Sequence, residues 1–160
     1  MTTDVLQAVS LAVAQCLTLT DALSAITQGL VRSGGVALAR VWLIDDGDRC
    51  SSCVQASVCT ARDRCLHLSA SHGHSRREPQ KRWSRLDGHF SRIPLSDARK
   101  VGYVAHRSTP VLIPDIQGDS RWVARPDWIA AEGIASFAGQ PLVAMGKTLG
   151  AIAVFSRSRL

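Results

Sequence analysis

Two apolar segments near the C-terminus, separated by only three residues, constrain the fold most strongly. Residues 136–144 and 148–156 are dense in branched and small apolar side chains, and Met145-Gly146-Lys147 joins them. Segments of this length and composition are typical of β-strands, and so short a connection places the two strands side by side and antiparallel. The sequence therefore predicts a terminal β-hairpin.

The remaining apolar pattern predicts helices first and strands afterwards. Apolar residues recur every three or four positions over residues 4–17 and 21–33, the period of a helix with one buried face. Thr20 or Asp21 is the expected N-cap of the second helix, and Gly34-Gly35 ends it. The later expected strands lie over residues 36–44, 66–70 and 110–114, with an edge strand over 90–95 that Pro94 interrupts. Two later helices are expected, one capped by Ser96-Asp97 and ending at Val104 and one over residues 126–132. The terminal hairpin follows them. Strands joined largely by hairpins predict an antiparallel sheet covered by helices, an α+β fold.

Length and composition predict a single domain over residues 1–160. Such a length, with 46% hydrophobic residues, lies in the usual range of one compact domain. No apolar run is long enough to span a membrane, and Met1-Thr2-Thr3-Asp4 lacks the basic start of a signal peptide. We therefore expect a cytoplasmic protein with no membrane partner.

The net charge of +6 comes from one segment of the chain. Residues 76–107 contain nine Lys and Arg against three Asp and Glu, whereas the rest of the chain contains ten of each sign. The segment carries no nucleic-acid-binding motif, so we do not expect nucleic acid as a partner. A solvated face, or one that docks an acidic partner domain, is the expected role.

Four of the five cysteines lie close together in the sequence. Cys50, Cys53, Cys59 and Cys65 are separated by two, five and five residues, and they occupy a loop over residues 49–65 between the first two expected strands. A loop of this length needs an organising principle of its own, and clustered cysteines in a reducing compartment indicate metal or redox chemistry. The fifth, Cys16, lies on the apolar stripe of the first helix and is expected to be buried.

Several short motifs resemble those of GAF domains, which are sensory modules of signalling proteins. They lie at residues 40–43, 66–71, 93–95, 101–105, 110–115, 119–121, 132–142 and 149–156. The resemblance implies a six-stranded antiparallel sheet with helices on one face and a small-ligand pocket on the other. The run Ser136-Phe137-Ala138-Gly139-Gln140-Pro141-Leu142 is most similar to GAF modules of bacterial histidine kinases and sigma-54-dependent transcriptional activators. This similarity implies that the partner is an output domain of a longer signalling protein, or a separate kinase or regulator. It also allows a homodimer through the N-terminal helices.

The cysteine pattern favours an iron–sulfur cluster over zinc. Four cysteine ligands suit either, but structural zinc sites usually pair short knuckles, and only Cys50 and Cys53 form one here. Uneven spacings are common in iron–sulfur proteins, and a sensor gains from a cofactor that changes state, whereas zinc is redox-inert. Arg49, Arg62 and Arg64 can offset the negative charge of bound thiolates, partly opposed by Asp63. We expect Cys50, Cys53, Cys59 and Cys65 to hold a cluster of unspecified type; zinc, redox disulfides and free thiols stay open as alternatives.

The expected function is therefore a sensor of redox state, oxygen or nitric oxide, and not an enzyme. No nucleophile–base motif, phosphate loop or zinc-protease motif is present. A covalent bilin is not expected, because Leu66 separates Cys65 from His67; His67 itself is expected to be a plain strand residue rather than a metal ligand. Two alternatives remain: a GAF domain with a structural zinc loop and a small organic ligand, and a thiol redox enzyme similar to GAF-like methionine sulfoxide reductases.

Overall fold

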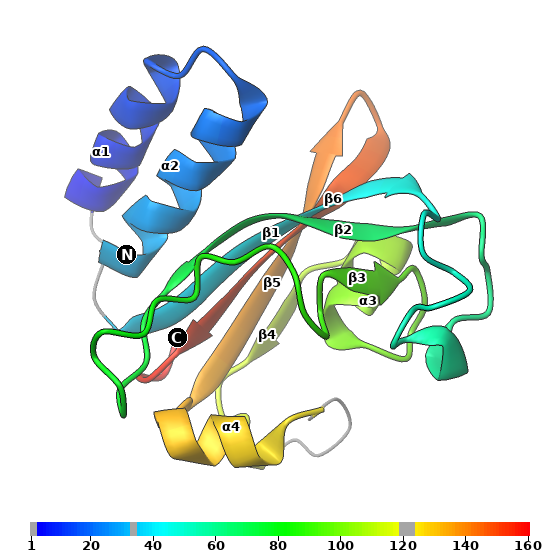
Figure 1. The fold of residues 1–160 in the computed structure, drawn as a ribbon. Coiled ribbons are helices and arrows are strands. Elements are labelled where there is room, and N and C mark those ends of the chain that lie inside the picture. The colour runs from blue at the N-terminus through cyan, green and yellow to red at the C-terminus, as the bar shows by residue number, and fades with distance from the viewer. Residues whose placement is uncertain (1–2, 33–34, 119–123) are drawn as a thin grey trace.

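A six-stranded antiparallel sheet in the order β3-β2-β1-β6-β5-β4 is the centre of the fold (Figure 1). The computed structural model describes residues 3–32, 35–118 and 124–160. The strands are β1 (Val36–Asp46), β2 (Arg64–Gly73), β3 (Arg92–Pro94), β4 (Val111–Ile113), β5 (Ser136–Ala144) and β6 (Lys147–Ser156). The helices are α1 (Thr3–Ala14), α2 (Leu19–Arg32), α3 (Lys100–Arg107) and α4 (Pro126–Glu132), with one 3-10 turn, η1 (Ala56–Val58). The predicted α+β class and six-stranded sheet are confirmed.

The terminal hairpin pairs β5 with β6 along nearly their whole length. Ala144 is opposite Lys147, so the turn consists of Met145 and Gly146, with φ values of 50° and 72°. Two successive residues with positive φ suit the twist of a hairpin, and glycine adopts such a φ without strain. Lys147, expected in the connection, is the first residue of β6.

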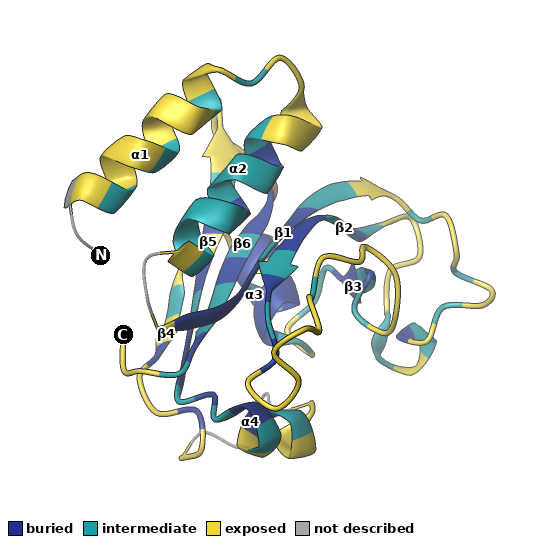
Figure 2. Ribbon diagram, turned by 60° about the vertical axis from the view of Figure 1, so that its left-hand side comes forward, coloured by how far each residue is buried: buried dark blue, intermediate teal, exposed yellow. Residues whose placement is uncertain are grey.

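The two faces of the sheet have different coverings. On one face α2 packs on β1 and β2, and α1 packs on α2. Val41 of β1 is buried there with Leu23 and Ala70. On the opposite face, Leu38 and Trp42 point toward α3 and α4, because successive strand residues alternate between faces. Figure 2 shows the buried centre of the sheet and the mostly exposed outer surface of α1.

Two helix starts differ from the prediction. The Asp21 N–H donates to Thr18 Oγ1 at 3.1 Å, so Thr18 caps α2 in place of Thr20 or Asp21. Helix α3 begins after Arg99 rather than after Ser96-Asp97. Asp97 instead forms an ion pair with Arg107 on the last turn of α3. The expected helix stop at Gly34 and the motif residues 119–121 lie outside the described residues.

The first helix ends at Ala14, short of the predicted residue 17. As a consequence Cys16 is only half-buried, and its thiol donates to the Ala12 carbonyl at 3.2 Å; the prediction of a buried Cys16 is wrong. Among the described helices, none combines the length and the apolar character needed to cross a membrane.

Candidate functional site: the cysteine loop

The segment between β1 and β2 folds back on itself and is closed at its base. The Gly47 N–H donates to the Asp63 carbonyl at 2.8 Å, which joins the two ends of the loop. Gly47 is also a point of close approach, since a Cβ there would lie 2.6 Å from the Arg62 carbonyl oxygen and 2.7 Å from Cys50 Sγ. The loop therefore folds so that Cys50 lies close to Arg62, near the C-terminal end of the loop.

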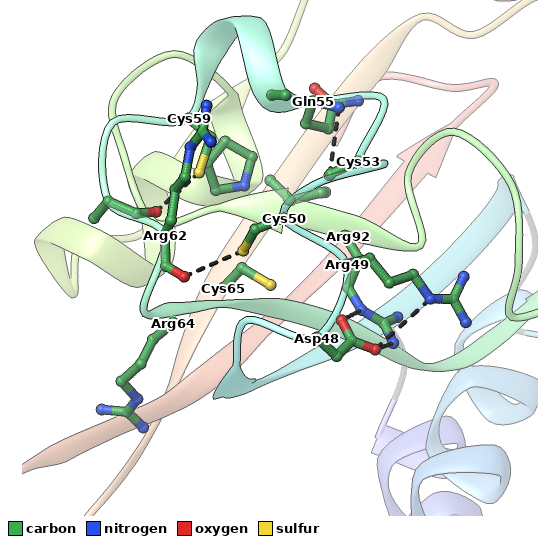
Figure 3. Close-up of a pocket in the computed structure, with 14 residues that line it drawn as sticks. Asp48, Arg49, Cys50, Cys53, Gln55, Cys59, Arg62, Arg64, Cys65 and Arg92 are labelled. Atoms are coloured by element: carbon green, nitrogen blue, oxygen red, sulfur yellow. Dashed lines mark hydrogen bonds and ion pairs between the residues drawn. The ribbon is translucent and has the colours of Figure 1, made fainter.

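All four clustered cysteines line one cavity (Figure 3). Cys50, Cys53 and Cys59 come from the loop, and Cys65 is the second residue of β2. Four arginines and Ile93 and Pro94 of β3 complete much of the wall. The cavity encloses about 20 Å³, room for about one water-sized group. The structure thus brings together the four residues that the spacing predicted, at the edge of the sheet.

Three of the sulfur atoms have backbone partners. The Cys50 thiol donates to the Arg62 carbonyl at 3.1 Å, and the Cys59 thiol donates to the Ala61 carbonyl at 2.9 Å. Cys53 Sγ instead accepts a hydrogen bond from the Gln55 N–H at 3.4 Å. Among the described residues, no three Cys, His, Asp or Glu side chains converge closely enough to surround a metal ion as they stand.

The thiols of Cys59 and Cys65 are held in their neutral form. Burial raises the pKa of Cys65 to about 11, although the Arg92 charge opposes this. Burial also raises the pKa of Cys59, and the neighbouring Cys50 and Cys53 add to the effect. Metal ligation needs thiolates, so a metal that binds here must displace protons.

An ion pair ties the loop to the edge strand. Arg92 of β3 donates to Asp48 through Nε at 2.8 Å and through Nη2 at 2.6 Å. This hydrogen-bonded pairing holds the pKa of Asp48 well below its usual range. His67 turns to this side of the site rather than into the cavity, with Nε2 2.9 Å from the Asp46 carbonyl oxygen and 3.8 Å from Asp48.

Gln55 is a site residue that the sequence did not single out. The residue is 1% exposed. Nε2 donates to the His89 carbonyl at 3.0 Å, and Oε1 accepts from Arg99 Nε at 3.0 Å. Gln55 therefore connects the cysteine loop to the N-terminal end of α3. No local sequence signal marks it, because both partners are distant along the chain.

A second, larger cavity lies on the sheet face opposite α2, where the family resemblance implied a ligand pocket. It encloses about 280 Å³ between β1 and β6 of the sheet and the starts of α3 and α4. Trp42 and Trp128 both line it.

Comparison with solved structures gives the same architecture. The GAF domain of an Acinetobacter phosphoenolpyruvate-protein phosphotransferase is 16% identical and superposes with a TM-score of 0.63 over 98% of this chain and 77% of that one. The A. aeolicus nlh2 GAF domain in an inactive state is 16% identical, with a TM-score of 0.62 over 96% of this chain and 77% of that one. A type II free methionine-R-sulfoxide reductase from Thermoplasma acidophilum is 14% identical, with a TM-score of 0.58 over 94% and 78%. Such identities establish a shared fold alone.

The family assignment comes from the sequence itself. No relative is found among the curated proteins. A family model described as the GAF domain, however, matches residues 18–160, which include every strand of the sheet and all helices except α1. The chain therefore belongs to the GAF domain family, a fold of signalling and sensor modules that bind small molecules.

Proposed function

We propose that residues 1–160 form one sensory domain of a bacterial signalling protein in which Cys50, Cys53, Cys59 and Cys65 hold an iron–sulfur cluster. The observation that carries the proposal is that all four thiols line one cavity, although three come from an irregular loop and one from a strand. The cluster would respond to redox state, oxygen or nitric oxide.

The surroundings of the cavity suit bound thiolates. A metal with four thiolate ligands carries net negative charge, and Arg49, Arg62, Arg64 and Arg92 all line the cavity. The Gln55 N–H already donates to Cys53 Sγ, and hydrogen bonds of this kind tune iron–sulfur sites. These groups supply positive charge and a hydrogen-bond donor beside the thiols that would hold the cluster.

Zinc is the second candidate, and the cavity volume favours it. About 20 Å³ accommodates a single ion, whereas a cluster requires the loop to open. The uneven ligand spacing and the sensory family favour the cluster. A zinc loop would be structural, and the signal would then be a small organic ligand.

We propose a sensory role rather than a catalytic one. A thiol reductase needs an activated thiolate, commonly paired with a base. In the described loop, the sulfur atoms of Cys50, Cys53 and Cys59 bond to backbone groups rather than to a general base. The reductase activity named for the Thermoplasma relative is the alternative, and an assay with free methionine sulfoxide and a thiol reductant tests it.

The signal would leave through the elements attached to the loop. Loss or oxidation of the cluster would rearrange the loop, which is continuous with β1 and β2, and α2 packs on both strands. Helix α1, which packs on α2, exposes Leu6 and Leu11. We propose that this helix pair contacts an output domain, a separate kinase or transcription regulator, or a second copy of the chain, in the cytoplasm.

Metal analysis of anaerobically purified protein tests the proposal. We expect iron and acid-labile sulfide, together with a visible absorption band that is lost in Cys53→Ala. Cys16→Ala is the matched control, because Cys16 lies outside the cavity, and it should keep the band. Colourless protein without iron contradicts the cluster; stoichiometric zinc in its place supports the second candidate, and protein free of both metals contradicts both.

A further inference from the structure

The larger cavity contains a strand arginine that faces the enclosed space. Arg40 lies on β1 between Leu38 and Trp42, and all three line the cavity. Its Nε donates to Ser71 Oγ at 3.0 Å, and Ser71 is the residue directly opposite on β2. Ser71 in turn donates to the Trp83 carbonyl. The guanidinium is therefore held in place by the sheet itself.

The charge of Arg40 has no counterion in the part of the chain that the structure describes. None of the ion pairs among those residues involves it. Burial lowers the pKa of Arg40 to about 10. A partly buried cation without a counterion among the described residues is costly, so an anion from outside the chain would stabilise it.

The other polar groups around the cavity are also cationic. Arg99 and Lys100 enter from the start of α3 and Arg125 from the start of α4, and no described lining residue is an Asp or Glu. Arg99 is held by the neutral amide of Gln55, and Lys100 Nζ lies 5.0 Å from the centre of the Phe137 ring. The described lining of the cavity therefore carries positive charge, which disfavours cations.

Aromatic rings form the apolar wall. The ring centroids of Trp83 and Trp128 lie 5.4 Å apart. Those of Trp128 and Phe155 lie 5.5 Å apart, with the rings in an edge-to-face arrangement. Trp42 and Phe90 line the same space, with the Trp42 indole N–H donating to the Phe90 carbonyl at 2.9 Å. Such a wall favours a planar ring that can stack or meet these edges.

The volume limits the ligand to a small molecule. Pockets for drug-sized ligands enclose about 300–1,000 Å³, and this cavity, at about 280 Å³, lies just below that range. One ring or two fused rings with a short acidic group fit such a space better than a nucleotide does.

We propose that this cavity binds a small aromatic carboxylate, with the carboxylate on Arg40 and the ring packed against the wall that Trp83, Trp128 and Phe155 form. The Arg40 guanidinium would donate to the carboxylate, as arginine commonly does in a bidentate pair. The inference goes beyond the cysteine-loop proposal and does not rest on it, because none of these four residues lines the cysteine cavity.

Calorimetric titration of the full chain tests the ligand class. Benzoate and indole-3-acetate are the probes, each compared with its uncharged amide, and acetate serves as the charged probe without a ring. We expect each aromatic acid to bind at least about tenfold more tightly than its amide, the size of one charge-assisted hydrogen bond. Acetate should bind far more weakly than benzoate, because it lacks the ring.

Variants locate the site. Arg40→Gln keeps a donor for Ser71 but removes the charge, and it should weaken benzoate binding by about tenfold or more. Arg85→Gln removes the same charge from an exposed side chain that pairs with Asp87, so it should bind benzoate as the unaltered chain does. Trp128→Leu should weaken the aromatic acids and leave acetate unchanged.

Three results would overturn the proposal: equal affinity for acid and amide, no binding of either aromatic acid at millimolar concentration, or equal effects of Arg40→Gln and Arg85→Gln. The acid–amide comparison uses the unaltered chain, so it remains decisive even if Arg40→Gln fails to fold. The benzoate titration is repeated on Cys53→Ala, the variant that tests the cysteine-loop proposal. The comparison shows whether the two proposals fail independently of each other.

Discussion

Glu132, the last residue of α4, is a buried carboxylate held by three groups. Ser75 Oγ donates to it at 2.7 Å, the Arg76 N–H at 2.6 Å, and Arg157 Nη2 lies 3.5 Å away. Burial raises the pKa of this carboxyl, but these hydrogen bonds and the Arg157 charge outweigh burial and hold the pKa below 4.5. Because the folded state binds the proton less tightly, the carboxylate contributes stability above pH 4.5 that is lost as pH falls through the folded-state value.

We expect Glu132→Gln to lower the free energy of unfolding by about 2 kcal/mol at neutral pH, because the amide replaces a charged acceptor and leaves buried donors poorly matched. The difference from the unaltered chain should shrink in acid, where that carboxyl is protonated. Urea unfolding at neutral and acidic pH measures both effects. Glu78→Gln, an exposed control that pairs with Lys81, should change stability by less than about 0.5 kcal/mol. A difference that is independent of pH would contradict an ionised Glu132.

At the scale of elements, Gln55 joins the loop around η1 to the start of α3. Gln55→Ala removes the partners of the His89 carbonyl and of Arg99, so we expect a loss of about 2 kcal/mol in unfolding free energy. Amides in the first turn of α3 should exchange hydrogen faster, while those in β5 and β6 should not change. Gln117→Ala, at an exposed position, is the control. Unchanged exchange in α3 would mean that the loop and the helix are not coupled through Gln55.

Apolar periodicity predicted the elements better than their ends. It predicted α4 over the residues observed, and the hairpin, the edge position of β3 and the place of the cysteine loop are confirmed. The prediction of the α2 N-cap was wrong because Thr18, Thr20 and Asp21 are all residues that commonly cap helices. Only the position of the folded helix decides which of them does so. Gln55 could not be predicted, since its partners lie 34 and 44 positions away. Cofactor binding by the cysteines stays a prediction.

At the scale of the whole molecule, the structure divides the basic segment among several sites. Arg85 and Arg107 pair with Asp87 and Asp97 on the surface, whereas Arg92 pairs with Asp48 beside the cysteines. Arg99 and Lys100 line the larger cavity. A charge excess that looks like one docking face in the sequence is thus divided among surface ion pairs and the walls of the two cavities.

The two sites meet at Arg99, which lines the larger cavity and is held by Gln55 of the cysteine loop. A metal that moves the loop would therefore move Arg99 and change the affinity of the cavity for benzoate. Such a coupling is reciprocal, and typical coupling energies of about 1–3 kcal/mol correspond to about 5- to 150-fold. We expect the benzoate affinities of metal-loaded and metal-stripped chain to differ within that range. Benzoate should change the metal affinity by the same factor.

Gln55→Ala separates this coupling from a direct effect of the metal. Both titrations on this variant should give a factor close to one, whereas Gln117→Ala should retain the full factor. A coupling that survives Gln55→Ala would show that the signal travels from the loop through β1 and β2 rather than through Arg99. Equal benzoate affinity with and without metal in the unaltered chain would show that the two sites act independently, and the cysteine loop would then signal through the sheet and α2 alone.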